Sequence, residues 1–152
     1  MKNYHGFSFI EVMFVAAIIA ILVAIALPSY EQQTQKTRRA DAVAVLSGFA
    51  VAMERYYTTQ SPPSYINATA ASGGVGPGKP KGNLFPSSVP VNGSSTFYDL
   101  KVKSASASAF EIQAIPVNQQ ANDPCGTLIY RSTGVKAISG AVKGMTWKDC
   151  WE

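Results

Sequence analysis

The hydrophobic positions follow three different spacings along the 152-residue chain. Residues 12–27 are apolar without a break, and with residues 7–10 they reach about the 20 residues that a helix needs to span a membrane. Between residues 42 and 57 the apolar positions recur every three or four residues, which predicts an amphipathic helix. Beyond residue 96 apolar and polar positions alternate, which predicts strands.

One long helix is therefore expected up to about Thr59, roughly 80 Å at about 1.5 Å per residue. Pro28 removes the backbone hydrogen bond to the Ala24 carbonyl, which favours a kink or local melting. Arg38 and Arg39 follow in a polar stretch, and we expect them to be solvated or to contact neighbouring copies. The first half of this helix has no core in its own chain, so lipid or other copies of the helix must bury it.

A loop is expected over residues 60–95, because prolines and glycines exclude regular structure from most of it. A loop of this length in a small domain is often functional. Its segment GKPKG places Lys79 and Lys81 at a flexible tip, where solvated lysines are the plain expectation. Contact with the phosphates of DNA is the alternative for these two side chains.

Antiparallel strands are expected after the loop, and the pattern predicts four of them, at residues 97–103, 110–115, 127–131 and 135–139. Lys101 and Lys103 lie on the polar side of the first strand. The sheet would pack against the apolar face of the helix, which gives an α+β fold. Trp147 and Trp151 are expected to cap this sheet.

The composition of the chain excludes several classes of functional site. The single histidine, His5, makes a histidine-based catalytic or metal site untenable, and no acid cluster suited to calcium is visible. We therefore expect a protein that is not an enzyme and needs no metal or cofactor. The net charge of +4 is mild for a strong nucleic-acid binder. Cys125 and Cys150 suit one disulfide formed in an oxidising compartment, which would close a loop of about 26 residues and stabilise the domain by roughly 3.5 kcal/mol.

Glu11 requires an explanation, because an ionised carboxylate at membrane depth costs roughly 3 kcal/mol or more. A secretory signal cleaved near Ala24-Ile25-Ala26 leaves this acid unexplained, and so does a plain membrane anchor. Cleavage between Gly6 and Phe7 would instead create an α-amino group one helical turn before Glu11. Because that amine can pair with the acid within a chain or between chains, Glu11 is interpreted as a docking point that sets the register of an assembly.

The N-terminus resembles the class III signal of type IV prepilins, which combines a short basic leader, a glycine–phenylalanine step, an early acid and a long apolar run. The likeness extends through GFSFIEVMFVAAIIAILVAIALPSY. It implies that a membrane-embedded prepilin peptidase cuts after Gly6 and methylates Phe7, and that Glu11 and Pro28 serve assembly. It also implies the type IV pilin fold. In that fold residues 1–6 are a leader, residues 7–28 are the transmembrane or fibre-core half of the helix, and residues 29–59 are its amphipathic half. Residues 60–95 are an αβ-loop, and residues 96–152 form a sheet with a disulfide-bonded C-terminal region.

The tail resembles the C-terminal region of PilE-type minor pilins of Gram-negative type IV pili, with Cys-Gly before a TLxxxxTG hairpin and a closing Cys-Trp. The two resemblances imply a subunit that starts as a prepilin in the inner membrane and joins other pilin subunits in an extracellular fibre. A minor pilin that supports pilus assembly, adhesion or twitching motility is the favoured hypothesis. The alternatives are a major pilin, a type II secretion pseudopilin, and a DNA-binding pilin for natural transformation. The DNA-binding pilin would use Lys79, Lys81, Lys101 and Lys103, and it would release DNA as salt rises.

Overall fold

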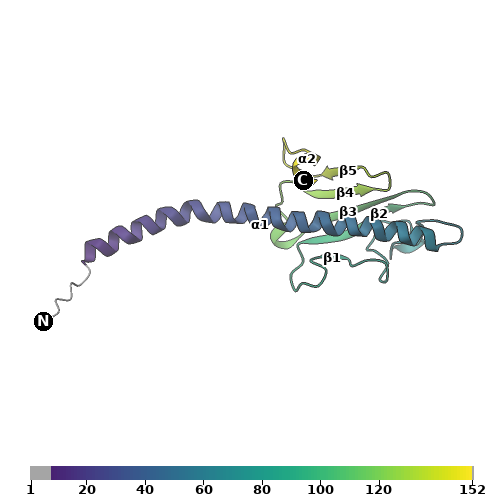
Figure 1. Ribbon diagram of the computed structural model, residues 1–152, viewed down its shortest axis with the longest axis horizontal. Coiled ribbons are helices and arrows are strands. Elements are labelled where there is room, and N and C mark those ends of the chain that lie inside the picture. Colours follow the sequence, from purple (N-terminus) through teal and green to yellow (C-terminus); the bar gives the residue numbers. More distant parts are fainter. Residues whose placement is uncertain (1–7, 152) are drawn as a thin grey trace. The chain divides into compact units, whose positions relative to one another are not determined.

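The computed structural model describes residues 8–151, which form one long helix, a mostly antiparallel head and a short C-terminal helix (Figure 1). In chain order the elements are α1 (Phe9–Thr59), η1 (Ser72–Gly74), β1 (Ser88–Val89), β2 (Tyr98–Ala105), β3 (Phe110–Pro116), η2 (Asn118–Gln120), β4 (Thr127–Arg131), β5 (Lys136–Ser139) and α2 (Trp147–Trp151). The chain divides after Lys36 into two compact units, which are described separately.

The first unit contains the apolar part of α1. All residues from Ser8 to Gln33 are exposed within the single chain. A window of this helix has a mean hydropathy of 2.9, so α1 is long and apolar enough to cross a membrane. The helix also continues through Pro28. Local melting at Pro28 is therefore not seen in this single chain, because the loss of one backbone hydrogen bond leaves the turns on either side intact, and a kink there stays a prediction.

The second unit packs the rest of α1 against one face of the sheet (Figure 1). Apolar residues of the helix are buried at spacings of three or four, and these are Ala42, Leu46, Phe49, Ala50 and Met53. The strands contribute the opposite side of the core, and its fully buried members include Tyr98, Leu100, Val102, Ile112, Ala114 and Leu128. Each large side chain buried in this way contributes about 1.5–3 kcal/mol. The core therefore fixes this half of the helix on the sheet.

The sheet has five antiparallel strands in the order β1-β2-β3-β4-β5, so each strand lies beside its neighbours in sequence. Leu100 lies opposite Ala114, Ala114 opposite Leu128, and Leu128 opposite Ile138, which makes one continuous apolar face. The α+β fold expected from the sequence is confirmed, with five strands in place of four. The additional strand, β1, has two residues, which is too short to show an alternating pattern.

Candidate functional site

The αβ-loop (residues 60–95) is fixed to the edge of β2 around Gly78. Gly78 and Val102 exchange two backbone hydrogen bonds, of 3.0 and 2.8 Å. Gly76 lies beside the same strand with a φ of 93°, and a Cβ there would be 2.8 Å from the carbonyl oxygen of Lys103. Only glycine accepts both this φ and this close approach. The GKPKG segment is thus an ordered part of the head, contrary to the flexible tip expected from its composition, because backbone hydrogen bonds hold it.

This attachment brings three of the four candidate lysines together. In the antiparallel register set by Gly78 and Val102, Lys79 lies opposite Lys101, and Lys103 lies two residues further along β2. Lys79 and Lys103 are exposed, and Lys101 is half-buried. No ion pair joins any of them to a carboxylate within residues 8–151. We call these three lysines the basic edge.

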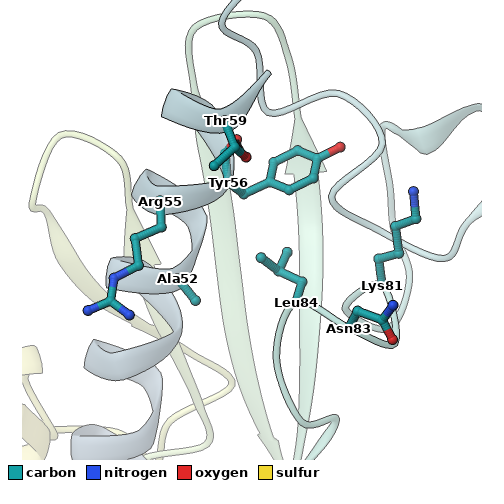
Figure 2. Close-up of a pocket in the computed structure, with 7 residues that line it drawn as sticks. All are labelled: Ala52, Arg55, Tyr56, Thr59, Lys81, Asn83 and Leu84. Carbon is teal, nitrogen blue, oxygen red and sulfur yellow. Dashed lines mark hydrogen bonds between the residues drawn. The ribbon is translucent and has the colours of Figure 1, made fainter. Parts of the chain in front are cut away.

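Lys81, the fourth candidate lysine, lines a groove between the last turns of α1 and the αβ-loop (Figure 2). The groove has a volume of about 480 Å³, within the range of roughly 300–1,000 Å³ that is typical of ligand sites. Its lining, which we call the basic groove, consists of Ala52, Arg55, Tyr56, Thr59, Lys81, Asn83 and Leu84.

Two cations line the basic groove, and its lining includes no carboxylate. Figure 2 shows Arg55 on α1 and Lys81 on the loop at opposite sides of it. Neither side chain forms an ion pair in the part of the chain that the structure describes. The hydroxyl of Tyr56 donates a hydrogen bond of 3.0 Å to the Ile66 carbonyl, which holds the aromatic ring at the groove. The arrangement suits an anionic ligand that also carries an apolar or aromatic part.

Sequence reasoning did not find the helical half of this groove. Arg55 and Tyr56 lie in a regular helical pattern, where exposed polar residues carry no special signal. Asn83 lies in the loop without a recognisable motif around it. Residues 8–151 contain no group of three or more His, Cys, Asp and Glu residues that could hold a metal ion.

A buried polar network attaches the disulfide-bonded region to α1. Arg39 is only 7% exposed, contrary to the solvated position expected, and its guanidinium donates hydrogen bonds of 2.5 and 3.1 Å to the Asp123 carboxylate. Tyr98, Gln120 and the Cys125 amide also donate to Asp123. Burial alone would raise the pKa of Asp123, but the hydrogen bonds from Arg39, Tyr98, Cys125 and Gln120 outweigh it and lower that pKa. Burial and the hydrogen bond to Asp123 raise the pKa of Tyr98. Asp123 is therefore a buried anion held by four donor groups.

The expected disulfide between Cys125 and Cys150 is confirmed, with 5.8 Å between the two Cα atoms. Trp151 is buried beside it and donates an indole hydrogen bond of 3.1 Å to the Ala137 carbonyl, so it caps the sheet as expected. Trp147 does not, because 46% of it is exposed.

The residues expected to act in processing and assembly belong to the first unit. Gly6 and Phe7 lie outside the described residues, so cleavage and methylation there stay predictions. Glu11 lies in the first turn of α1, where its backbone amide donates to the Ser8 carbonyl at 3.0 Å. Its side chain is exposed and makes no ion pair with residues 8–151, which leaves the carboxylate for a partner from elsewhere. Pro28 lies within the same exposed helix.

Comparison with known proteins gives two family matches and several relatives. Residues 28–129 match the family described as type IV minor pilin ComP, DNA uptake sequence receptor, and residues 1–27 match the prokaryotic N-terminal methylation motif. The chain is 46% identical to a fimbrial protein of Pseudomonas aeruginosa over 54 residues, which are 36% of this chain and 35% of that protein. It is 34% identical over 88 residues to fimbrial protein EcpC of Eikenella corrodens, which are 58% of each chain. The chain thus matches 35% to 58% of the length of these two relatives.

Among solved structures, the chain is similar to the crystal structure of the non-core minor pilin PilV of Neisseria meningitidis. The TM-score is 0.51 at 17% sequence identity, over 76% of this chain and 95% of that one. This likeness concerns the fold alone. The family match is the stronger finding, because it covers more than half of the chain and includes the basic groove and the basic edge. The chain is a type IV pilin subunit and belongs to the family of ComP-type minor pilins.

Proposed function

We propose that this pilin is a minor subunit that binds DNA during natural transformation, and that the basic groove and the basic edge make the contact. The observation that carries the proposal is a concave site with Arg55 and Lys81 on opposite sides, inside the region that matches a family of DNA uptake sequence receptors. Among the alternatives open at the level of sequence, this match favours DNA binding over adhesion or motility alone.

Five cations of the head have no ion-pair partner within the described residues. Arg55, Lys81 and the three lysines of the basic edge form no ion pair there, so their charge is available to phosphates. Each phosphate that they neutralise releases condensed counterions, which makes binding favourable at low salt. Lys79 of the basic edge and Lys81 of the basic groove lie two residues apart in one loop, so the two sites adjoin along the chain. A nucleic-acid backbone that follows this loop contacts both.

The N-terminal motif supports the proposal that the chain is a subunit of a pilus fibre. Processing after Gly6 and methylation of Phe7 by a prepilin peptidase would leave the mature helix in the inner membrane, and residues 7–28 would then pack with other pilin subunits in a fibre. The pairing of the new amine with Glu11 would set the position of each subunit. The exposed apolar surface of α1 fits this role, because it has no core of its own. The fibre then carries the DNA-binding head outside the cell.

The test is DNA binding by the full chain in mild detergent, measured by fluorescence anisotropy with a labelled duplex over a series of salt concentrations. The double variant Arg55→Gln/Lys81→Gln removes both cations of the basic groove. Lys36→Gln is the matched control, because Lys36 is an exposed lysine of α1 outside the head. We expect the slope of log K against log salt to become shallower by about 2 in the double variant and to stay unchanged in the control.

Two results would contradict the proposal. The unaltered chain binding no DNA at low salt would remove the function altogether. Equal slopes for the unaltered chain and the double variant would show that DNA does not contact the basic groove.

A further inference from the structure

Trp147 occupies a position that the core does not explain. It is 46% exposed at the start of α2, and it lines a pocket of about 300 Å³ together with Gly134, Val135 and Lys136. α2 lies beside β5 at the edge of the sheet (Figure 1). Val135, from the same pocket, is 46% exposed as well. An open indole and an aliphatic side chain therefore form an apolar surface at this edge.

Two lysines lie at this pocket. The ammonium of Lys148 lies 5.9 Å from the centre of the Trp147 ring, and Lys136 lines the pocket with its ammonium 5.4 Å from the Trp151 ring. Asp149 is the acid nearest in sequence within the described residues, and its carboxylate accepts hydrogen bonds of 2.8 and 2.6 Å from the amide and hydroxyl of Thr146. Asp149 does not line the pocket, whose lining contains Lys136 and no carboxylate.

Lys136 and Arg131 lie close in the sheet but on different faces. Lys136 begins β5 and pairs with Tyr130 on β4. Because successive side chains of a strand point to opposite faces, Arg131 lies on the other face, where it forms an ion pair of 2.9 Å with Glu111. The charge that is available at the pocket is therefore that of Lys136 and Lys148.

We propose that this pocket binds an unpaired nucleobase, which stacks on Trp147 while Lys136 and Lys148 contact the adjoining phosphates. The proposal rests on the DNA-binding function proposed above and extends it to a second site. That site lies beyond residues 28–129, so the family match does not assign it. Every base has an aromatic face that an exposed indole can stack on, and the flanking cations complement the backbone. A second pilin head is the less suitable occupant, because an apolar protein contact leaves both lysines without an anion.

Duplex DNA keeps its bases stacked on one another, so only an unpaired base reaches the indole. The inference therefore makes a specific statement about the substrate: single-stranded DNA, or duplex with an unpaired end, gains a contact that blunt duplex lacks. Removing that stacking is expected to weaken binding about 5- to 150-fold. The salt slope should stay the same, because no charge is lost.

The experiment compares a labelled oligothymidine with a blunt duplex of two fully complementary strands, using full-length chain in mild detergent. The variants are Trp147→Ala, Trp147→Leu and Trp147→Phe. Leucine keeps apolar bulk without a ring, and phenylalanine keeps a ring. We expect the alanine and leucine variants to lose affinity for the oligothymidine alone, the phenylalanine variant to retain most of it, and duplex binding to change less than twofold. Quenching of tryptophan fluorescence by the oligothymidine should persist in Trp151→Phe, in which Trp147 is the remaining indole.

The outcomes separate the two proposals. Equal oligothymidine affinity for the unaltered chain and Trp147→Ala would overturn this inference and leave duplex binding at the basic groove in place. Equal losses for both DNA forms in all three variants would also overturn it, because the pocket would then have a structural role. Loss of the chain from surface fibres with unchanged DNA binding would identify a pilin contact in its place. The unaltered chain binding neither DNA form would remove the proposed function and this inference with it.

Discussion

Replacement of Asp123 by alanine tests how the head is held together. The change removes the carboxylate that accepts the hydrogen bonds of the buried Arg39 guanidinium, and with it the hydrogen bonds from Tyr98, Gln120 and the Cys125 amide. Both charged residues are at most 7% exposed, so water cannot replace the lost carboxylate without opening the core. Breaking a buried ion pair on one side costs about 3–5 kcal/mol. For a head of this size that corresponds to a loss of about 10–20 °C in melting temperature.

The assay is thermal unfolding of the oxidised full chain in mild detergent, followed by near-ultraviolet circular dichroism, which reports the packed aromatic residues of the head. A double-mutant cycle with Arg39→Met supplies the control, because methionine fills space without a charge. Since both charges are then removed together, the double variant should be more stable than Asp123→Ala alone. A loss below about 1 kcal/mol for Asp123→Ala, or strict additivity in the cycle, would refute the argument that this pair is buried and coupled.

Three further predictions follow from the same contacts. Folding lowers the pKa of Asp123 below 3.8, so the ionised carboxylate stabilises the fold fully above pH 3.8, and this stabilisation is lost as pH falls through the native pKa. Thermal unfolding measured between pH 7 and pH 2 should show this loss of stability in the unaltered chain and a weaker loss in Asp123→Ala. Replacing Cys125 and Cys150 by serine should lower the free energy of unfolding in urea by about 3.5 kcal/mol, and an unchanged midpoint would contradict it. Gly76→Ala should loosen the αβ-loop, because its φ of 93° and the Lys103 carbonyl exclude a Cβ; faster amide exchange at Gly78 and Val102 would show this, and unchanged exchange would count against it.

The sequence was informative wherever a pattern repeats within one element. The apolar run before Pro28, the helical spacing around Leu46 and Phe49, and the alternation in β2 and β3 each extend over enough residues to identify the element and its buried face. β1 was missed because two residues cannot show a period. Glu11 was recognised as a candidate functional residue because a lone acid within a long apolar run is rare and costly in a membrane.

Contacts between distant parts of the chain were not accessible in this way. Arg39 and Asp123 are 84 residues apart, and nothing near Arg39 in the sequence distinguishes it from its half-buried neighbour Arg38. Lys79 lies opposite Lys101 only because Gly78 pairs with Val102. The basic groove forms where the loop crosses α1. The position of this crossing is set by the backbone hydrogen bonds of the loop, and the composition of the loop does not reveal it.

The central claim is that one chain is both a fibre subunit and a DNA binder, and one measurement tests both parts. Surface fibres sheared from cells would be captured on immobilised DNA, eluted with salt, and analysed by intact mass and N-terminal sequencing. We predict this chain in the eluate with a methylated Phe7 at its N-terminus and one intramolecular disulfide, and its loss from the eluate of cells that carry Arg55→Gln/Lys81→Gln. Recovery of the chain only from membranes, or fibres that contain it but pass over the DNA unretained, would contradict the account.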